Sequence, residues 1–168
     1  PYTTLFRSIS TALISSLAQS NPEVARQKKT LETLVQAKQA LIAWAVLQGD
    51  LGTDTYRRPG TLPCPDTNFF GTADSGNASG SCSSSGGTSI GRFPWKSLGI
   101  EMQSDATGEP LWYAVSDNFR RPGLTNAAIN SNTVGNLRLY SANGTTLTTP
   151  EGEELAAIII APNSPLAG

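Results

Sequence analysis

Apolar residues recur with a helical period along the first part of the chain. From Ile9 to Gln48 the residues are mostly helix formers, interrupted only by the triplet SNP at 20–22. At about 100° per residue, several apolar side chains point within about 20° of one direction. They are Leu13, Leu17, Val24, Leu31, Val35 and Ile42, with Ile9, Leu34, Leu41 and Ala45 beside them. The pattern predicts a long amphipathic α-helix over residues 9–48.

This apolar stripe keeps its phase across Pro22. A helix that began afresh after a loop would have no reason to preserve the phase, so one continuous helix with a kink near Pro22 is favoured. The alternative is a new helix in which Ser20 or Asn21 is the N-cap and Pro22 is the first helical residue.

The length of this helix implies that part of it protrudes. About forty residues form a rod of about 60 Å, whereas a domain of a hundred-odd residues has a radius of gyration of about 13 Å. The stripe is narrow and charged at its edges, which is typical of a helix that packs on a neighbouring helix or on another copy. We expect residues 31–47 to lie on the protein's own sheet. The predicted assembly face consists of Leu13, Leu17, Val24, Leu31 and Val35.

The rest of the chain, residues 49–168, predicts a globular head built from strands. Residues 66–91 form a predicted surface loop, because twelve of the eighteen residues from 74 to 91 are Gly or Ser. The stretch 91–100 is typical of a turn with two aromatic anchors, and 111–116 of a strand. Residues 136–149 predict a hairpin with Asn143 and Gly144 in a type I′ turn, and 155–161 a buried strand. A helix followed by antiparallel strands predicts an α+β fold, with the long N-terminal helix packed on the sheet.

The composition excludes several function classes. Twelve Lys and Arg balance thirteen Asp and Glu to a net charge of −1, without a basic run, so nucleic acid is not a predicted partner. The 168 residues include no histidine, which removes His-based triads, His general bases and most catalytic zinc sites. We therefore predict a protein that is not an enzyme and needs no cofactor.

The two cysteines, Cys64 and Cys82, lie eighteen positions apart, and Cys64 stands between two prolines. Two cysteines without histidine cannot complete a four-ligand zinc site, and this spacing is not that of a CxxC redox pair. In an oxidising compartment we expect a disulfide that tethers the Gly/Ser-rich loop. The alternative is a pair of free, buried thiols in a cytosolic protein.

Other candidate sites are weaker than an ordinary structural explanation. Asp66, Asn68 and Asp74 form a faint calcium candidate, but an Asx-rich turn explains them better because an EF-hand's alternating acids and closing Glu are missing. Asp105 and Glu109 are more typical of a turn than of a glycosidase pair. Lys38 is expected to pack its stem along the helix rather than act as a base. Core packing is favoured over a sugar-binding platform for Trp95, Trp112, Tyr113 and Phe119.

Five short motifs resemble, in the same order, a group of bacterial type IV pilin-like and type II secretion pseudopilin-like proteins. They are LVQAKQALIAWAV, LPCPD, GRFPWKSLGI, DATGEPLWYAVSDNF and AAIIIAPNSPLAG. The segment Asp105-x-x-Gly108-x-Pro110-x-x-Tyr113 is also similar to the Asp-x-x-Gly-x-Pro signature near the sheet of major pseudopilins. Relatives often carry a further Cys at the position of Pro110, so their disulfide pattern does not transfer whole, and none of their calcium ligands is carried over.

The resemblance implies a structural subunit for protein assembly in a type IV pilus or a type II secretion system. An upstream apolar helix would anchor it in the bacterial inner membrane and then pack against other pilin-like subunits, with the exported head periplasmic or extracellular. Residues 1–8, PYTTLFRS, match the translation of a sequencing adapter, so we expect them to be an assembly artefact and the natural protein to extend upstream. The alternative function is a secreted or surface-attached binding module or adhesin.

Overall fold

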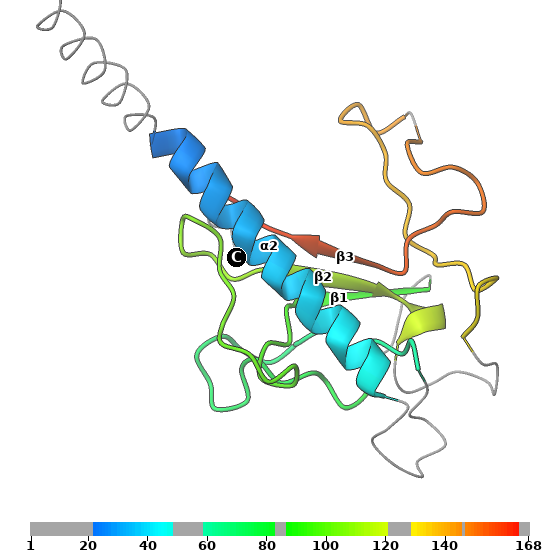
Figure 1. Ribbon diagram of the computed structural model, residues 1–168, viewed down its shortest axis with the longest axis horizontal. Coiled ribbons are helices and arrows are strands. Elements are labelled where there is room, and N and C mark those ends of the chain that lie inside the picture. The colour runs from blue at the N-terminus through cyan, green and yellow to red at the C-terminus, as the bar shows by residue number, and fades with distance from the viewer. Residues whose placement is uncertain (1–21, 49–58, 83–86, 121–128, 146, 165–168) are drawn as a thin grey trace, which may run out of the picture.

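The chain forms one helix and a small antiparallel sheet, as shown by a computed structural model that describes residues 22–48, 59–82, 87–120, 129–145 and 147–164 (Figure 1). The elements are α2 (Pro22–Leu47), β1 (Thr88–Arg92), β2 (Trp112–Ser116), the 3-10 turn η1 (Asp117–Phe119) and β3 (Ala157–Ile160). The predicted α+β class is confirmed. The predicted helical residues 9–21, and with them the predicted kink, lie outside the described residues.

The sheet has the strand order β1-β2-β3, and both pairs are antiparallel. Tyr113 of β2 pairs with Gly91 of β1 and with Ile159 of β3. Because side chains alternate along a strand, Tyr113, Val115 and Ile159 share one face of the sheet. That face packs against α2, which crosses the sheet diagonally in Figure 1. The core therefore lies between one helix and one face of three strands.

The predicted loop 66–91 is too long at its C-terminal end, because β1 begins within it at Thr88. Sequence pattern misses this strand since its residues, TSIGR, do not alternate between apolar and polar. The buried positions are Ser89 and Gly91, not Ile90. A Cβ at Gly91 would lie 2.6 Å from the carbonyl oxygen of Asp66, so only glycine allows the preceding segment to approach this strand.

The face of α2 that packs on the sheet is not the predicted stripe. The buried residues of α2 are Thr30, Ala37 and Leu41, which point in one direction around the helix, and the buried Gln48 follows directly after its end. The stripe residues Leu31, Val35 and Ile42 point about 120° away and are exposed. The flanking Leu34, Leu41 and Ala45 supply the apolar contact instead, and the small Ala37 lets the helix come close.

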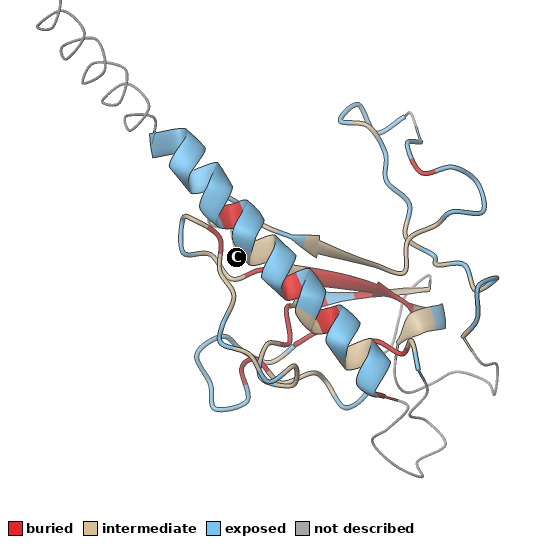
Figure 2. Ribbon diagram, in the orientation of Figure 1, coloured by how far each residue is buried: buried red, intermediate tan, exposed pale blue. Residues whose placement is uncertain are grey.

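The first turns of α2 stand clear of the head. Pro22 to Lys29 are all exposed, and burial begins at Thr30 (Figure 2). Across the described ranges, the structure holds no helix with the length and apolar character needed to cross a bilayer.

The predicted hairpin at 136–149 is present in outline, but its turn is of another type. Tyr140 pairs with Leu147 in an antiparallel bridge. Asn163 is the single non-glycine residue with positive φ in the described part of the chain, so Asn143 does not take the left-handed conformation that a type I′ turn requires. The loop is longer: Gly144 N–H donates to Ser141 O, and the Asn143 carboxamide accepts from Thr145 N–H.

The predicted buried strand at 155–161 becomes β3, which lies at the edge of the sheet and is only half-buried. Ala157 and Ile159, on one face of β3, pack toward α2, whereas Ile160 is exposed. A continuous apolar run predicts burial on both faces, and here one layer of helix covers only one of them.

Candidate functional site

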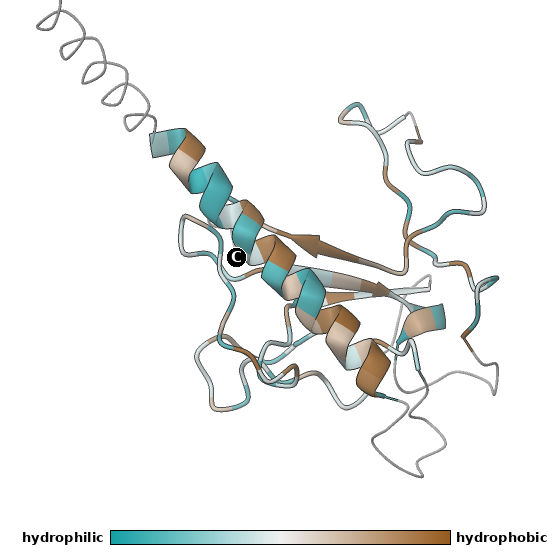
Figure 3. Cartoon of the chain, in the orientation of Figure 1, coloured by the Kyte–Doolittle hydropathy of each residue, from teal (hydrophilic) through white to brown (hydrophobic). Residues whose placement is uncertain are grey.

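An apolar row runs along the exposed side of α2. Val24, Leu31 and Val35, three of the five predicted assembly-face residues, are 58%, 62% and 46% exposed. Leu13 and Leu17, the other two, lie outside the described residues. Ile42 and Val46 continue the row toward the helix end and are also exposed. Figure 3 shows apolar residues alternating with polar ones along the exposed side of α2. Leu31 and Val35 bury little surface within the chain, so a partner could cover them.

The side chains around this row are charged and solvated. Lys28 and Glu32 approach to 3.9 Å as an (i, i+4) pair, with both side chains largely exposed. Exposed pairs of this kind contribute little to stability. Lys28 and Glu32 therefore keep one flank of the row hydrated.

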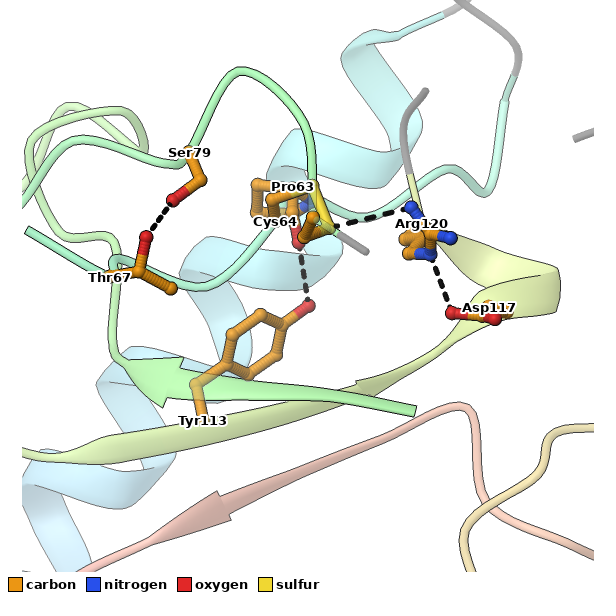
Figure 4. Close-up of a disulfide and its surroundings, with 8 residues drawn as sticks. Pro63, Cys64, Thr67, Ser79, Tyr113, Asp117 and Arg120 are labelled. Carbon is orange, nitrogen blue, oxygen red and sulfur yellow. Dashed lines mark hydrogen bonds and ion pairs between the residues drawn. A yellow bond between two sulfur atoms is a disulfide. The ribbon is translucent and has the colours of Figure 1, made fainter. Parts of the chain in front are cut away.

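A disulfide between Cys64 and Cys82 closes the loop that follows the helix connection (Figure 4), which confirms the predicted tether. Both cysteines are buried, and their Cα atoms lie 5.7 Å apart. The buried Tyr113 of β2 donates its hydroxyl hydrogen to Pro63 O at 3.2 Å, and burial raises the pKa of this phenol. The start of the loop is thus fixed to the middle of the sheet.

A second set of contacts around Asp66 holds the body of the loop. The Asp66 carboxylate is buried and accepts from Asn68 N–H at 2.9 Å and from Gly76 N–H at 2.6 Å. Its backbone exchanges two hydrogen bonds with Arg92 of β1. Gly76 has a φ of +88°, which favours glycine at this position. The loop is therefore built around one buried carboxylate and joined to the sheet edge.

The calcium candidate residues meet, but through an amide group. Asn68 Nδ2 donates to Asp66 Oδ1 at 2.8 Å, to Asp74 O at 3.0 Å and to Asn77 O at 3.3 Å. Three oxygen atoms thus converge on a nitrogen donor, and Asp74 contributes its backbone rather than its exposed side chain. In the described part of the chain, no group of three acidic, His or Cys side chains could hold a metal. The arrangement is that of an Asx-rich turn.

Asp105 joins its own turn to the segment after β3, a role that its sequence position does not predict. It is fully buried, and its Oδ1 accepts from Thr107 Oγ1, Thr107 N and Glu109 N, while its Oδ2 accepts from Asn163 N at 2.7 Å. Burial raises the pKa of Asp105, but these four hydrogen bonds outweigh it and leave the pKa below its usual value of 3.8. Glu109 contributes its backbone N–H to this turn, which is the structural turn that the sequence predicts.

This junction joins three segments. The turn that contains Asp105 also donates Ala106 N–H to Thr30 Oγ1 of α2 at 3.1 Å. Asn163, which follows β3, has a φ of +58°, and this conformation directs its N–H toward the carboxylate. The helix, the turn before β2 and the segment after β3 therefore meet at one buried carboxylate.

The four aromatic residues considered as a sugar platform do not lie on one surface. Tyr113 is buried in the core, and Trp95 and Phe119 pack against that core. Trp112 points to the opposite face of the sheet from Tyr113, because the two are adjacent in β2. Core packing is therefore confirmed for Tyr113, Trp95 and Phe119 but not for Trp112, which is half-buried on the other face of the sheet.

Two features of the surface were missed by sequence reasoning. Phe69 and Phe70, at the tip of the pinned loop, are 86% and 52% exposed, and the Arg92 guanidinium lies 5.3 Å from the Phe70 ring centroid. An apolar groove of about 740 Å³ lies between α2 and β3. Lys38 lines this groove and is exposed, in keeping with the stem packing predicted for it. Two adjacent phenylalanines in a polar loop could have indicated the exposed Phe pair from the sequence. No sequence pattern indicates the groove.

No protein-family model matches the chain, and neither a curated protein nor a solved structure matches it significantly. An N-terminal helix on a small antiparallel sheet, with a disulfide in the head, is compatible with a pilin-like fold. The family resemblance itself rests on the five sequence motifs.

Proposed function

We propose that the chain is a non-enzymatic structural subunit of a type IV pilus or a type II secretion pseudopilus-like filament. The α2 row packs against helices of other subunits, and the head faces outward. The upstream part of the protein anchors the subunit in the inner membrane before assembly, and the head is exported.

One observation carries this proposal: a helix whose apolar row, Val24, Leu31 and Val35, stays exposed while a different side of the same helix packs on the sheet. A helix that served its own head alone would need only one apolar side. Two apolar directions on one helix fit a helix with two partners, its own sheet and another helix. The disulfide supports export, because disulfides persist in oxidising compartments.

Charging the row is expected to weaken self-association of the chain. In the variant Leu31→Lys with Val35→Lys, both changed side chains are exposed, and lysine is a good helix former, so the fold should be kept. We expect association measured by sedimentation velocity to weaken about tenfold or more, because two ammonium groups would have to be desolvated in the contact.

The matched control places the same two charges on another side of α2. Gln36 and Ala43 are exposed and point away from the row. The variant Gln36→Lys with Ala43→Lys should associate like the unchanged protein. If both pairs of lysines weakened self-association equally, the cause would be the added net charge. That result would contradict a specific role for the row.

The upstream coding sequence offers a second test of the proposal. In the native gene we expect a prepilin leader followed by about twenty apolar residues, which is the length that spans a bilayer. An ordinary signal peptide that is cleaved just before residue 9 would contradict the filament role.

The alternative function, a secreted or surface-attached binding module, is favoured by the exposure of Phe69 on a pinned loop. In that case the loop would contact a surface ligand rather than another subunit. The binding-module alternative predicts that changes at Phe69 leave self-association intact. It also predicts that changes at Leu31 and Val35 do not affect ligand binding.

A further inference from the structure

The outer edge of β3 carries backbone groups that the sheet does not use. Ser116 N–H donates to Ala156 O at 2.9 Å, and these two residues lie opposite each other when the register of β2 and β3 is continued. Hydrogen-bonded positions alternate in an antiparallel pair, so the N–H and C=O groups of Ala157 and Ile159 point away from β2. Figure 1 shows β3 as the outermost strand. Within the described ranges, no hydrogen bond uses these outward groups.

The residues of β3 lack the features that usually guard an exposed edge. Natural proteins often place a charged side chain, a proline or a bulge on such a strand, because these prevent pairing with another strand. The sequence of β3 is AIII, which has neither charge nor proline, and its register with β2 runs without a bulge. Ile160 is apolar and yet 40% exposed. The edge is therefore suited to an added strand.

The α2–β3 groove lies on the helix side of the same strand. Ala157 and Ile159, whose backbone groups point outward, line it from β3, and Leu34 and Leu41 line it from α2. Its volume of about 740 Å³ is within the range of specific binding pockets. Side chains of an added strand alternate between the two faces of the sheet, so every second one would enter the groove. An extended segment can fill the groove and also pair with the edge, whereas a helix or a lipid chain offers no backbone groups for that pairing.

The charge of the groove adds a requirement for the segment that binds there. Of the described residues that line the groove, only Lys38 is charged. Its neighbours one turn away on α2, at positions 34, 35, 41 and 42, are all apolar. No ion pair forms at its ammonium group in the part of the chain that the structure describes. An acidic side chain on the bound segment would therefore complement Lys38, and such pairs favour register and partner choice more than affinity.

We propose that the edge of β3 binds an extended segment of a partner protein, which joins the sheet as a further strand. Apolar side chains at alternate positions of this segment fill the groove, and an acidic side chain on the same face reaches Lys38. Leu31 and Val35 do not line the groove, and Ile42 and Val46, which border both surfaces, stay unchanged in the test. The inference goes beyond the proposed filament role and does not depend on it.

The test uses the full chain and the synthetic peptide TDTVTVTDT, acetylated and amidated at its ends. Its Val and Asp side chains share one face, and the order is the same from either end, so the peptide can add in either direction. In one control peptide Lys replaces both Asp. In the other, two adjacent central residues are N-methylated, so one blocked amide faces the edge in either register.

We expect the Asp peptide to slow amide exchange at Ala157 and Ile159 by about tenfold or more, measured by NMR, because both N–H groups become hydrogen-bonded. The amides of Tyr113 and Val115 face β1 and should not change. The methylated peptide should give no protection. The Lys peptide should bind about threefold more weakly, as expected for an exposed charge pair.

The variant Lys38→Glu should reverse the preference between the Asp and Lys peptides. Its changed side chain is exposed, so the fold should be kept. Lys29→Glu makes the same change of charge at an exposed position of α2 that does not line the groove, and it should bind like the unchanged protein.

Three results would each overturn the inference. Equal protection by the methylated peptide would exclude backbone pairing, and binding of neither the Asp nor the Lys peptide would exclude strand addition. Protection that appears without peptide and rises with protein concentration would assign the edge to a second copy. The variant Leu31→Lys with Val35→Lys should bind the peptide like the unchanged protein while it loses self-association. Failure of the strand site is thus distinguishable from failure of the filament role.

Discussion

The variant Cys64→Ser with Cys82→Ser is expected to lower the free energy of unfolding by about 3 kcal/mol. The cysteines are eighteen positions apart, and the chain-entropy description attributes a loss of this size to the freedom that the unfolded chain regains. The side-chain contacts that remain in the loop are Tyr113–Pro63, Thr67–Ser79 and the hydrogen bonds of the Asp66 carboxylate. Chemical denaturation followed by tryptophan fluorescence measures the change.

The reductant response provides the control for this prediction. Treatment with dithiothreitol should bring the unchanged protein to the stability of the double variant, which itself should not respond. Protein purified without reductant should show no alkylated thiol by intact mass. A stability loss below about 1 kcal/mol would mean that the non-covalent contacts hold the loop by themselves, contrary to the expectation.

The variant Asp105→Asn is expected to destabilise the protein by about 3 kcal/mol at neutral pH, since buried hydrogen bonds to a charged group are worth about 1.5–3 kcal/mol each. The side chain accepts four hydrogen bonds on two oxygens, and an amide can replace only one of those oxygens as an acceptor. The new NH₂ group would then face either Asn163 N–H or the Thr107 and Glu109 donors. Thermal unfolding at constant pH measures the loss.

The pH dependence gives the same prediction a second measurement. Because the folded pKa of Asp105 is lowered, its contribution to stability is present above the usual value of 3.8 and is lost as pH falls through the folded value. The unchanged protein should therefore lose stability in acid more steeply than Asp105→Asn. Glu109→Gln, a change in the same turn, is the control and should keep the steep profile; identical profiles for Asp105→Asn and the unchanged protein would contradict the assignment.

The sequence predicted those parts of the fold that depend on local pattern. The helical period marks α2, the apolar run at 111–116 marks β2, and two cysteines without a metal-ligand set mark the tether. These features depend on residues that are close together in the sequence. Hydrophobic periodicity, composition and the number of cysteines are therefore enough to predict them.

Features that depend on the approach of distant segments were not predictable. β1 pairs with β2 along its whole length, and the sequence TSIGR indicates neither this pairing nor the approach of the Asp66 backbone that Gly91 allows. The packing side of α2 was misassigned because Thr30 and Gln48 are polar, although Thr30 is needed to bind Ala106 N–H. Asp105 looked like an ordinary turn residue, since its fourth donor, Asn163, lies 58 positions away.

The position of the Thr30–Ala106 contact has a mechanical consequence. Force applied to the protruding start of α2 along its axis is borne by this hydrogen bond and by the packing of Ala37 and Leu41. Such a load slides the helix across the sheet instead of lifting it, so these contacts resist together rather than one after another. Under tension along the helix the head would accordingly stay attached, whereas a pull at right angles to the helix would break the contacts in sequence and detach the head at lower force.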